Sequence, residues 1–210
     1  MRPSSTFTIQ PARPAMNFLQ VWLTGYVNPA RLVEELKGRP APLWGIYGQG
    51  LRALLDGLLL YLPLAVLGRA PSTPSFLTFV PTGRYYAWSI IMAPLFLLLE
   101  WLLLAALVHL ILRLAGYGSD IDQILNITGM AALVVGAFLL VWDWGYLLLG
   151  GSSDIFLGTS HLVFDIWAIV ITVLGFKRIL GVPVWLGLLL NAVWLVAAVP
   201  LNIIFVRGPV

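Results

Sequence analysis

Cysteine is absent from this chain of 210 residues, and the only histidines are His109 and His161. The lack of cysteine excludes disulfides, thiol catalysis and cysteine-bound zinc or iron–sulfur clusters. Two histidines so far apart in the sequence do not form a metal-binding motif either. The glycine-rich segment at 115–119 lacks the lysine of a phosphate-binding loop, and no nucleophile stands beside a paired base. We therefore predict a non-enzymatic protein without a metal or a cofactor.

Charged residues are also scarce, at 10% of the chain, whereas hydrophobic residues make up 60% and the mean hydropathy is +0.94. A soluble domain of this length does not need so many apolar residues to fill its core. The net charge of +3 is small and scattered, which argues against a nucleic-acid partner. The composition indicates an integral membrane protein whose first partner is the lipid bilayer.

Five apolar segments are each long enough to cross a hydrocarbon core of roughly 30 Å. Turns rich in glycine, proline and serine separate them. We predict an all-α membrane protein: a bundle of five transmembrane helices over residues 49–206, followed by a short outer tail at 207–210. The predicted spans are, within a few residues, 49–67, 87–112, 124–149, 160–176 and 184–206.

The chain before the first span divides into two parts. Residues 1–16 are polar and lack the apolar core of a signal peptide, so we expect a flexible tail, with a short transit peptide as the alternative. Residues 17–48 are predicted to form a cytoplasmic amphipathic segment at the membrane interface. Within it, Asn28 is expected to cap a helix that begins at Pro29 and ends before Gly38.

This short helix places Leu32, Val33 and Leu36 on one face and its charged residues elsewhere. An amphipathic helix of this kind lies along a membrane surface or docks on a partner. The basic residues of the connections then indicate the orientation. Eight lysines and arginines flank the spans on the side of the N-terminus and three on the other side, so we predict a cytoplasmic N-terminus and an outer C-terminus. The expected location is a bacterial or archaeal cytoplasmic membrane.

Charged residues inside the predicted spans need an explanation because they are costly in a bilayer. Arg52 and Asp56 are one helical turn apart, and we interpret them as a structural ion pair that also shares a face with Gln49. Glu100 lies in the middle of the second span among leucines. It is either a carboxyl group bonded to a neighbouring helix or part of a proton or cation relay. Its spacing from His109 turns the two side chains to opposite faces of the helix.

Asp143 and Asp165 lie near the outer ends of the third and fourth spans, with His161 one turn from Asp165. These three residues are candidates for a proton-binding or weak metal-binding cluster, and the alternative is a set of hydrated interfacial side chains. Small residues and asparagines on two other helix faces indicate close helix packing. This predicted packing seam consists of Gly129, Ala132, Gly136, Asn191 and Asn202.

The order of these elements resembles the YIP1 family of five-helix membrane proteins, in its prokaryotic form. The resemblance covers about Asn28 to Val206. It rests on the Asn28-Pro29 step into the short helix, the LAGYGS and IDQIL segments of 114–125 after the long second span, and the end of the fourth span from Trp167 to Arg178. The Asp-Leu-Tyr-Gly-Pro motif of eukaryotic members is absent. The resemblance implies a Yip1-domain fold but no established activity.

From these features we predict a membrane scaffold or partner-binding subunit. Its partners would be other membrane proteins or a cytoplasmic protein, and a homo-oligomer is a further option. The alternative is a small proton- or cation-linked transporter or channel that uses the intramembrane acids. The candidate partner-facing residues are Asn28, Pro29, Leu32 and Leu36 of the short helix and Gly116, Gly118, Asp120 and Asp122 of the turn between the second and third spans.

Overall fold

A computed structural model describes residues 16–209, and over these residues the chain is helical and contains no strand. The predicted tail at 1–16 lies almost wholly outside the described residues. Five helical stretches are long and apolar enough to cross a membrane, which confirms the predicted fold class. The helices are α1 (Phe18–Val27), α2 (Pro29–Lys37), α3 (Leu43–Leu55), η1 (Asp56–Tyr61), α4 (Leu62–Val66), η2 (Thr82–Arg84), α5 (Tyr85–Leu114), α6 (Ile121–Leu148), α7 (Asp154–Ile179) and α8 (Val184–Phe205).

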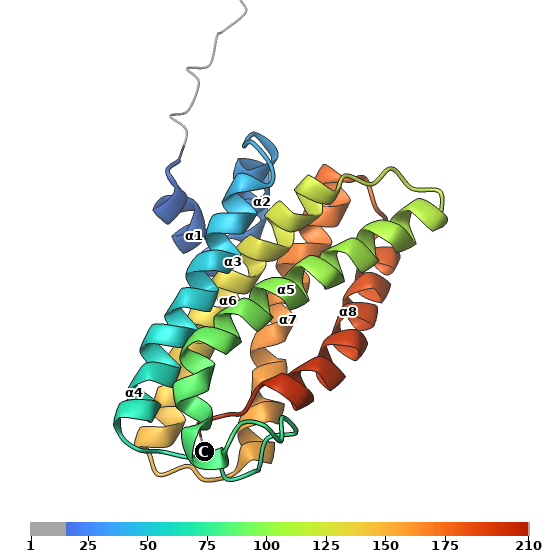
Figure 1. The fold of residues 1–210 in the computed structure, drawn as a ribbon. Helices are drawn as coiled ribbons and strands as arrows, with labels where there is room; N and C mark the ends of the chain where they lie inside the picture. Colours follow the sequence, from blue (N-terminus) through green and yellow to red (C-terminus); the bar gives the residue numbers. More distant parts are fainter. Residues whose placement is uncertain (1–15, 210) are drawn as a thin grey trace, which may run out of the picture.

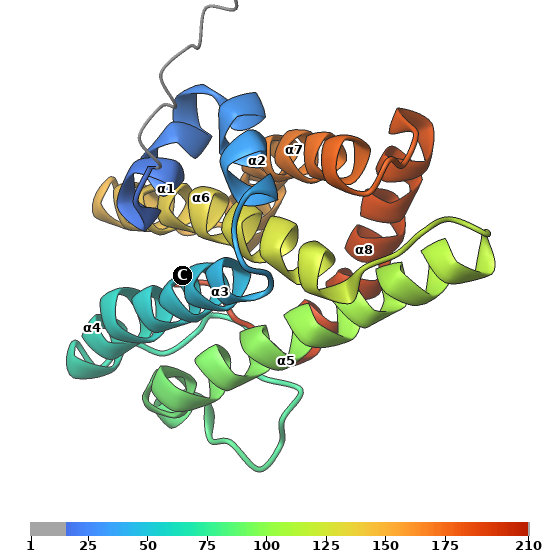
Figure 2. The same ribbon diagram turned by 90° about the horizontal axis from the view of Figure 1, so that it is seen from above.

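Helix α6 is the centre of the bundle (Figures 1 and 2). It packs against α3, α5 and α7, and α8 packs in turn against α5 and α7. Of the most apolar window of α6, 78% is buried inside the protein, against 6% for α8. The short helices α1 and α2 lie against α6 and α7 near one end of the bundle. Helix α8 is therefore the least buried of the five spans, whereas most of α6 is covered by protein and exposed apolar side chains such as Val141 and Leu148 lie towards its end.

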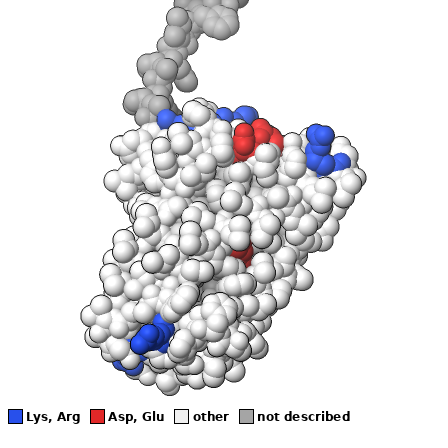
Figure 3. All heavy atoms as spheres, viewed as in Figure 1, with Lys and Arg blue, Asp and Glu red and all other residues white. Residues whose placement is uncertain are grey.

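The charged residues of the surface are distributed unevenly along the direction of the spans. On the face drawn in Figure 3, basic atoms gather towards both ends of the molecule and acidic atoms towards one end, with a broad uncharged band between the ends that only a small acidic spot interrupts. A band of this kind matches the hydrocarbon region of a bilayer, where charged side chains are costly. The chain is a multi-pass membrane protein by the length, composition and surface of its helices.

Two of the predicted spans begin earlier than expected. The first starts at Leu43 rather than near 49, and the fourth starts at Asp154 rather than near 160. The earlier start of α3 has a physical cause, since Gly45 and Gly48 bring its first two turns against α6. The polar Gln49 thus lies inside the bundle and does not mark its edge.

The contact between α3 and α6 is made by backbone against backbone. A methyl group at Gly129 would collide with the carbonyl group of Gly45, and one at Gly48 would come within 2.7 Å of the Gly129 carbonyl oxygen. Only glycine permits helices to approach so closely. The predicted packing role of Gly129 is therefore confirmed, but its partners, Gly45 and Gly48, were not among the predicted seam residues.

Asn126 strengthens the same contact. Its side-chain Oδ1 accepts a hydrogen bond of 2.7 Å from the backbone N–H of Gly45, and Asn126 is fully buried. The N–H groups in the first turn of a helix have no partner within that helix. Asn126 therefore caps α3 from a neighbouring helix, where the N-cap residue Pro42 offers no side-chain bond.

We expect Asn126→Leu to lower the free energy of unfolding by about 1–2 kcal/mol, because the buried Gly45 N–H loses its acceptor. The matched control is Asn17→Ala, which removes an exposed cap from α1 whose Oδ1 accepts from Gln20 N at 2.9 Å. That change should cost about 0.5–1 kcal/mol. Thermal unfolding in one detergent measures both, and an equal or smaller loss for Asn126→Leu would contradict the capping role.

Helix α2 has the predicted limits. Asn28 caps it by accepting a hydrogen bond from Arg31 N at 3.0 Å, Pro29 is its first residue and Gly38 follows its end. The assignment of Leu32 and Leu36 as partner-facing residues is wrong, however. Both are fully buried in a cluster with residues of α6 and α7, because the apolar face of α2 packs against the protein's own helices.

The turn between α5 and α6 is exposed at Gly116, Gly118, Asp120 and Asp122. Gly116 has a φ of +79°, a left-handed conformation that suits glycine after the end of a helix. Asp120 caps α6 by accepting hydrogen bonds from the backbone N–H groups of Asp122 and Gln123. Two of these residues thus have local structural roles, and all four remain accessible to a partner.

Candidate solute-binding cavity

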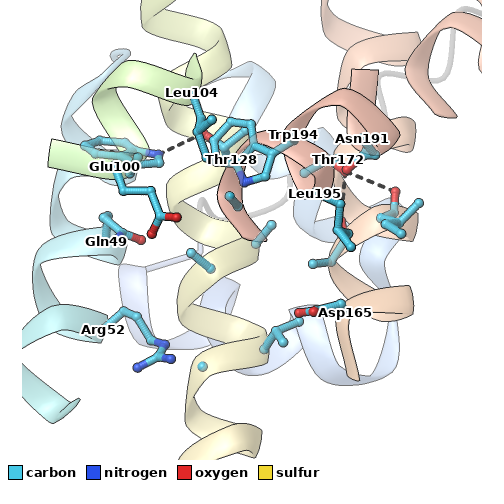
Figure 4. A pocket seen from close by; sticks show the side chains of 18 of the residues that line it. Gln49, Arg52, Glu100, Leu104, Thr128, Asp165, Thr172, Asn191, Trp194 and Leu195 are labelled. Carbon is cyan, nitrogen blue, oxygen red and sulfur yellow. Dashed lines mark hydrogen bonds between the residues drawn. The ribbon is translucent and has the colours of Figure 1, made fainter. Parts of the chain in front are cut away.

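A cavity of about 260 Å³ lies between the five spans. We call it the central cavity, and every span contributes residues to its wall. Most of the wall is apolar, but eight polar or charged residues also line it, and Figure 4 labels all of them except Asn202. These are Gln49, Arg52, Glu100, Thr128, Asp165, Thr172, Asn191 and Asn202. A mostly apolar cavity with a few convergent polar groups is the usual form of a small-molecule site.

Glu100 reaches the central cavity from the middle of α5. It follows Tyr85, the first residue of the helix, by 15 positions and precedes Leu114, the last, by 14. At 1.5 Å per residue, it lies about 21 Å or more from either end, in the centre of a bilayer. Only 8% of Glu100 is exposed, and its Oε1 accepts a hydrogen bond of 2.7 Å from Asn202 Nδ2 on α8. The carboxyl group is thus fixed by a bond between two spans.

Gln49 contributes an acceptor that is not used within the described part of the chain. Its Nε2 donates to the carbonyl oxygen of Leu97 at 3.0 Å, whereas its Oε1 is buried and finds no donor among residues 16–209. Figure 4 shows the side chains of Gln49 and Glu100 directed towards the same space. Since a buried polar atom without a bond is costly, this oxygen would gain from a donor or a cation in the cavity.

Arg52 is the only basic residue among the described residues that line the central cavity, and it forms an ion pair with Asp56. The pair predicted from the sequence is therefore present. The Arg52 side chain lies across Gly136 of α6, where a methyl group would collide with it. Asp56 itself is buried away from the cavity wall. The positive charge of Arg52 is thus neutralised by a carboxylate that does not itself line the cavity.

Only two of the three residues of the predicted outer cluster are bonded directly to each other. His161 Nε2 and Asp143 Oδ1 form a bond of 2.7 Å, whereas Asp165 lies on the wall of the central cavity opposite Gln49 and Arg52 (Figure 4). Asp143 is only 6% exposed, so the alternative of a hydrated interfacial side chain does not hold for Asp143, whereas the side chain of His161 is 29% exposed. Asp165 has no direct hydrogen-bond partner within 16–209, although it interacts electrostatically with His161 and Arg52.

The weak metal site weighed for these residues is also wrong. In the described part of the chain, no group of three or more histidine, aspartate or glutamate residues could hold a metal ion. The physical reason is that Asp165 turns into the cavity instead of towards the Asp143–His161 pair. As predicted from their spacing, Glu100 and His109 do not meet, and His109 Nδ1 instead bonds Ser119 Oγ at 2.8 Å.

The predicted packing seam also turns out to form part of the cavity wall. Ala132 and Gly136 of α6 and Asn191 and Asn202 of α8 all line it. The Oγ1 of Thr172 donates to Asn191 Oδ1 at 2.8 Å, which joins α7 to α8 beside the cavity. These residues therefore both join helices and give the cavity its polar surface.

Two tryptophans of the wall were missed by the sequence analysis. Trp101 of α5 donates from Nε1 to Thr128 Oγ1 at 2.9 Å, and Trp194 of α8 also lines the cavity and packs against the buried cluster that contains Trp101. Both occur in long apolar runs, where a tryptophan facing lipid and one facing a cavity look alike. The available signal was that Trp101 directly follows the intramembrane acid Glu100.

Three of the five spans are irregular near the cavity. The first contains a π-helical turn, η1, that starts at Asp56, while α5 and α8 contain Pro94 and Pro200. A π turn is often found at a functional site, and a proline within a helix frees a backbone carbonyl group. Such interruptions are tolerated at membrane depth where the backbone borders protein or a cavity.

The chain was also compared with known proteins. No protein-family model, curated protein or solved structure matches it. The resemblance to the YIP1 family therefore stays a prediction, and the function has to be argued from the cavity itself.

Proposed function

We propose that this membrane protein is a small carrier that binds a small organic cation in the central cavity and passes it across the bilayer. The charge of the cavity wall carries the proposal. Arg52 forms its ion pair with Asp56, and within residues 16–209 neither Glu100 nor Asp165 forms a salt bridge with a lysine or arginine, although Arg52 also attracts Asp165 at longer range. The free Oε1 of Gln49 adds a third acceptor to the wall of the central cavity.

The aromatic residues of the wall favour an ammonium ion over a metal ion. An ammonium group is attracted to the faces of tryptophan rings, and Trp101 and Trp194 border the cavity together with the acids. A dehydrated metal ion would need several oxygen ligands at about 2.0–2.6 Å, and the acids on the wall do not form such a group. The irregular spans η1, α5 and α8 support a bundle in which helices can shift around a bound solute.

Uptake of radiolabelled tetramethylammonium into vesicles containing the purified protein tests this function. Glu100→Gln and Asp165→Asn should each lower the initial rate at least tenfold, because each removes a negative charge from the cavity wall. The control is Asp122→Asn, the same kind of change at an exposed acid outside the cavity, and its rate should stay within twofold of the parent rate. Parent uptake no faster than in protein-free vesicles, or an equal loss for Asp122→Asn, would refute the carrier.

The scaffold predicted from the sequence is the second candidate, and the exposed turn between α5 and α6 favours it. Gly116, Gly118, Asp120 and Asp122 are all accessible there. Because the chain contains no cysteine, a single cysteine introduced at 118 can carry a crosslinker without background. A scaffold should give one crosslinked species from 118, with a second copy of the chain as one outcome, and none from a cysteine at the exposed Gly68. Equal crosslinking from both positions would count against it.

A further inference from the structure

A second cavity, of about 280 Å³, lies beside the central one and is almost entirely apolar. We call it the apolar cavity. It is bounded by the segment 77–80, the first half of α5 and the end of α8. Its aromatic wall consists of Phe79, Tyr85, Trp88, Phe96 and Phe205.

Two of the polar groups of the apolar cavity are bonded within the protein. Tyr85 Oη donates to the Phe205 carbonyl oxygen at 2.8 Å, and Ser89 Oγ donates to the Tyr85 carbonyl oxygen at 2.9 Å. Glu100 differs from them, because it is the one residue among 16–209 that lines both cavities and its bond to Asn202 occupies only Oε1. A carboxylate therefore lies at the point where a polar cavity and an apolar cavity meet.

We propose that the substrate is an amphiphilic cation whose ammonium head lies at Glu100 and whose hydrocarbon tail occupies the apolar cavity. This inference rests on the proposed carrier function and names its substrate class. Charge complementarity selects a cationic head, because Glu100 is the only charged group among the described residues that line the apolar cavity. The aromatic and aliphatic wall selects a tail that carries no polar group of its own.

A lipid tail is not a sufficient occupant, because nothing in the apolar cavity would distinguish it from the surrounding bilayer. An ammonium head changes this balance. In the bilayer the head of such a molecule stays at the hydrated interface, whereas Glu100 offers the positive charge a partner in a medium of low dielectric constant, where the attraction is strong. The head thus supplies the selectivity, and the shape of the apolar cavity determines which tails fit.

The test compares hexyltrimethylammonium with tetramethylammonium, which shares the head but has no tail. Binding is measured by calorimetry on the full chain in nanodiscs of phosphatidylcholine. Leu103→Trp fills the apolar cavity, and Leu102→Trp is its matched control. The two leucines are neighbours with similar exposure, 56% and 46%, but only Leu103 lines the apolar cavity. Partitioning of a ligand into the lipid is the same for every variant, so it cancels when the affinities of two variants for that ligand are compared.

We expect the parent to bind hexyltrimethylammonium at least tenfold more tightly than tetramethylammonium. Leu103→Trp should weaken the hexyl ligand at least fivefold and leave tetramethylammonium within twofold, whereas Leu102→Trp should change neither. Glu100→Gln should weaken both ligands at least tenfold. Thermal unfolding of each variant checks that it is folded before binding is compared.

The possible failures can be told apart. If tetramethylammonium binds but the tail gives no gain, or if Leu102→Trp weakens the hexyl ligand as much as Leu103→Trp, the substrate class is wrong and the carrier proposal stands. If hexyltrimethylammonium binds as expected but is not taken up by vesicles, the carrier proposal fails and the binding site stands. If the parent binds neither ligand, both are refuted.

Discussion

Replacing Gly129 by valine is expected to destabilise the helix bundle by about 3 kcal/mol or more. The added Cβ atom would collide with the backbone carbonyl group of Gly45 on α3. A backbone group cannot rotate out of the way as a side chain can, so α3 and α6 would have to separate. Separation would also break the hydrogen bond from Gly45 N to Asn126.

The matched control is Gly50→Val, which makes the same change on α3 at a position where no atom lies within 4 Å of the added Cβ. The two variants are compared by the temperature at which half of the protein stays monodisperse in one detergent. Gly129→Val should lower it by roughly 6–12 °C, and Gly50→Val should lower it little. An equal fall in both would mean that valine, and not the helix contact, causes the loss.

The sequence was a reliable guide to features that depend on neighbouring residues. The five spans follow from runs of apolar residues, and the limits of α2 follow from Asn28, Pro29 and Gly38, each of which acts within one helical turn. The Arg52–Asp56 pair is local in the same sense, because its members are four positions apart on one helix. In each case the pattern contains both partners within a single element.

Features that depend on which helix faces meet could not be predicted. Glu100 and Asn202 form a hydrogen bond between two spans that lie far apart in the sequence, and no sequence pattern in either span indicates which residue of the other it contacts. The apolar face of α2 fits lipid, a partner or the chain's own helices equally well, and only the fold shows that Leu32 and Leu36 pack inside. The central cavity could not be predicted for the same reason, because its wall combines residues from all five spans.

The position of Arg52 connects stability with the proposed function. Its guanidinium group borders the central cavity, where a free positive charge would repel a cationic solute. Asp56, which does not line the cavity, neutralises that charge. The net charge of the cavity wall then comes from Glu100 and Asp165. The ion pair is thus expected to matter both for folding and for binding.

Asp56→Ala is accordingly expected to lower the free energy of unfolding by about 3 kcal/mol, because it leaves Arg52 buried without its partner. The double variant Arg52→Met with Asp56→Leu removes both charges and should recover most of that loss. The control is Glu34→Ala, which breaks the exposed pair with Arg178 and should cost less than about 1 kcal/mol. If the double variant were as unstable as Asp56→Ala, the loss would come from packing at position 56. If the stability recovers, tetramethylammonium should bind the double variant about as well as it binds the parent. It should bind Asp56→Ala more weakly, because only this single variant leaves the positive charge of Arg52 unpaired on the cavity wall.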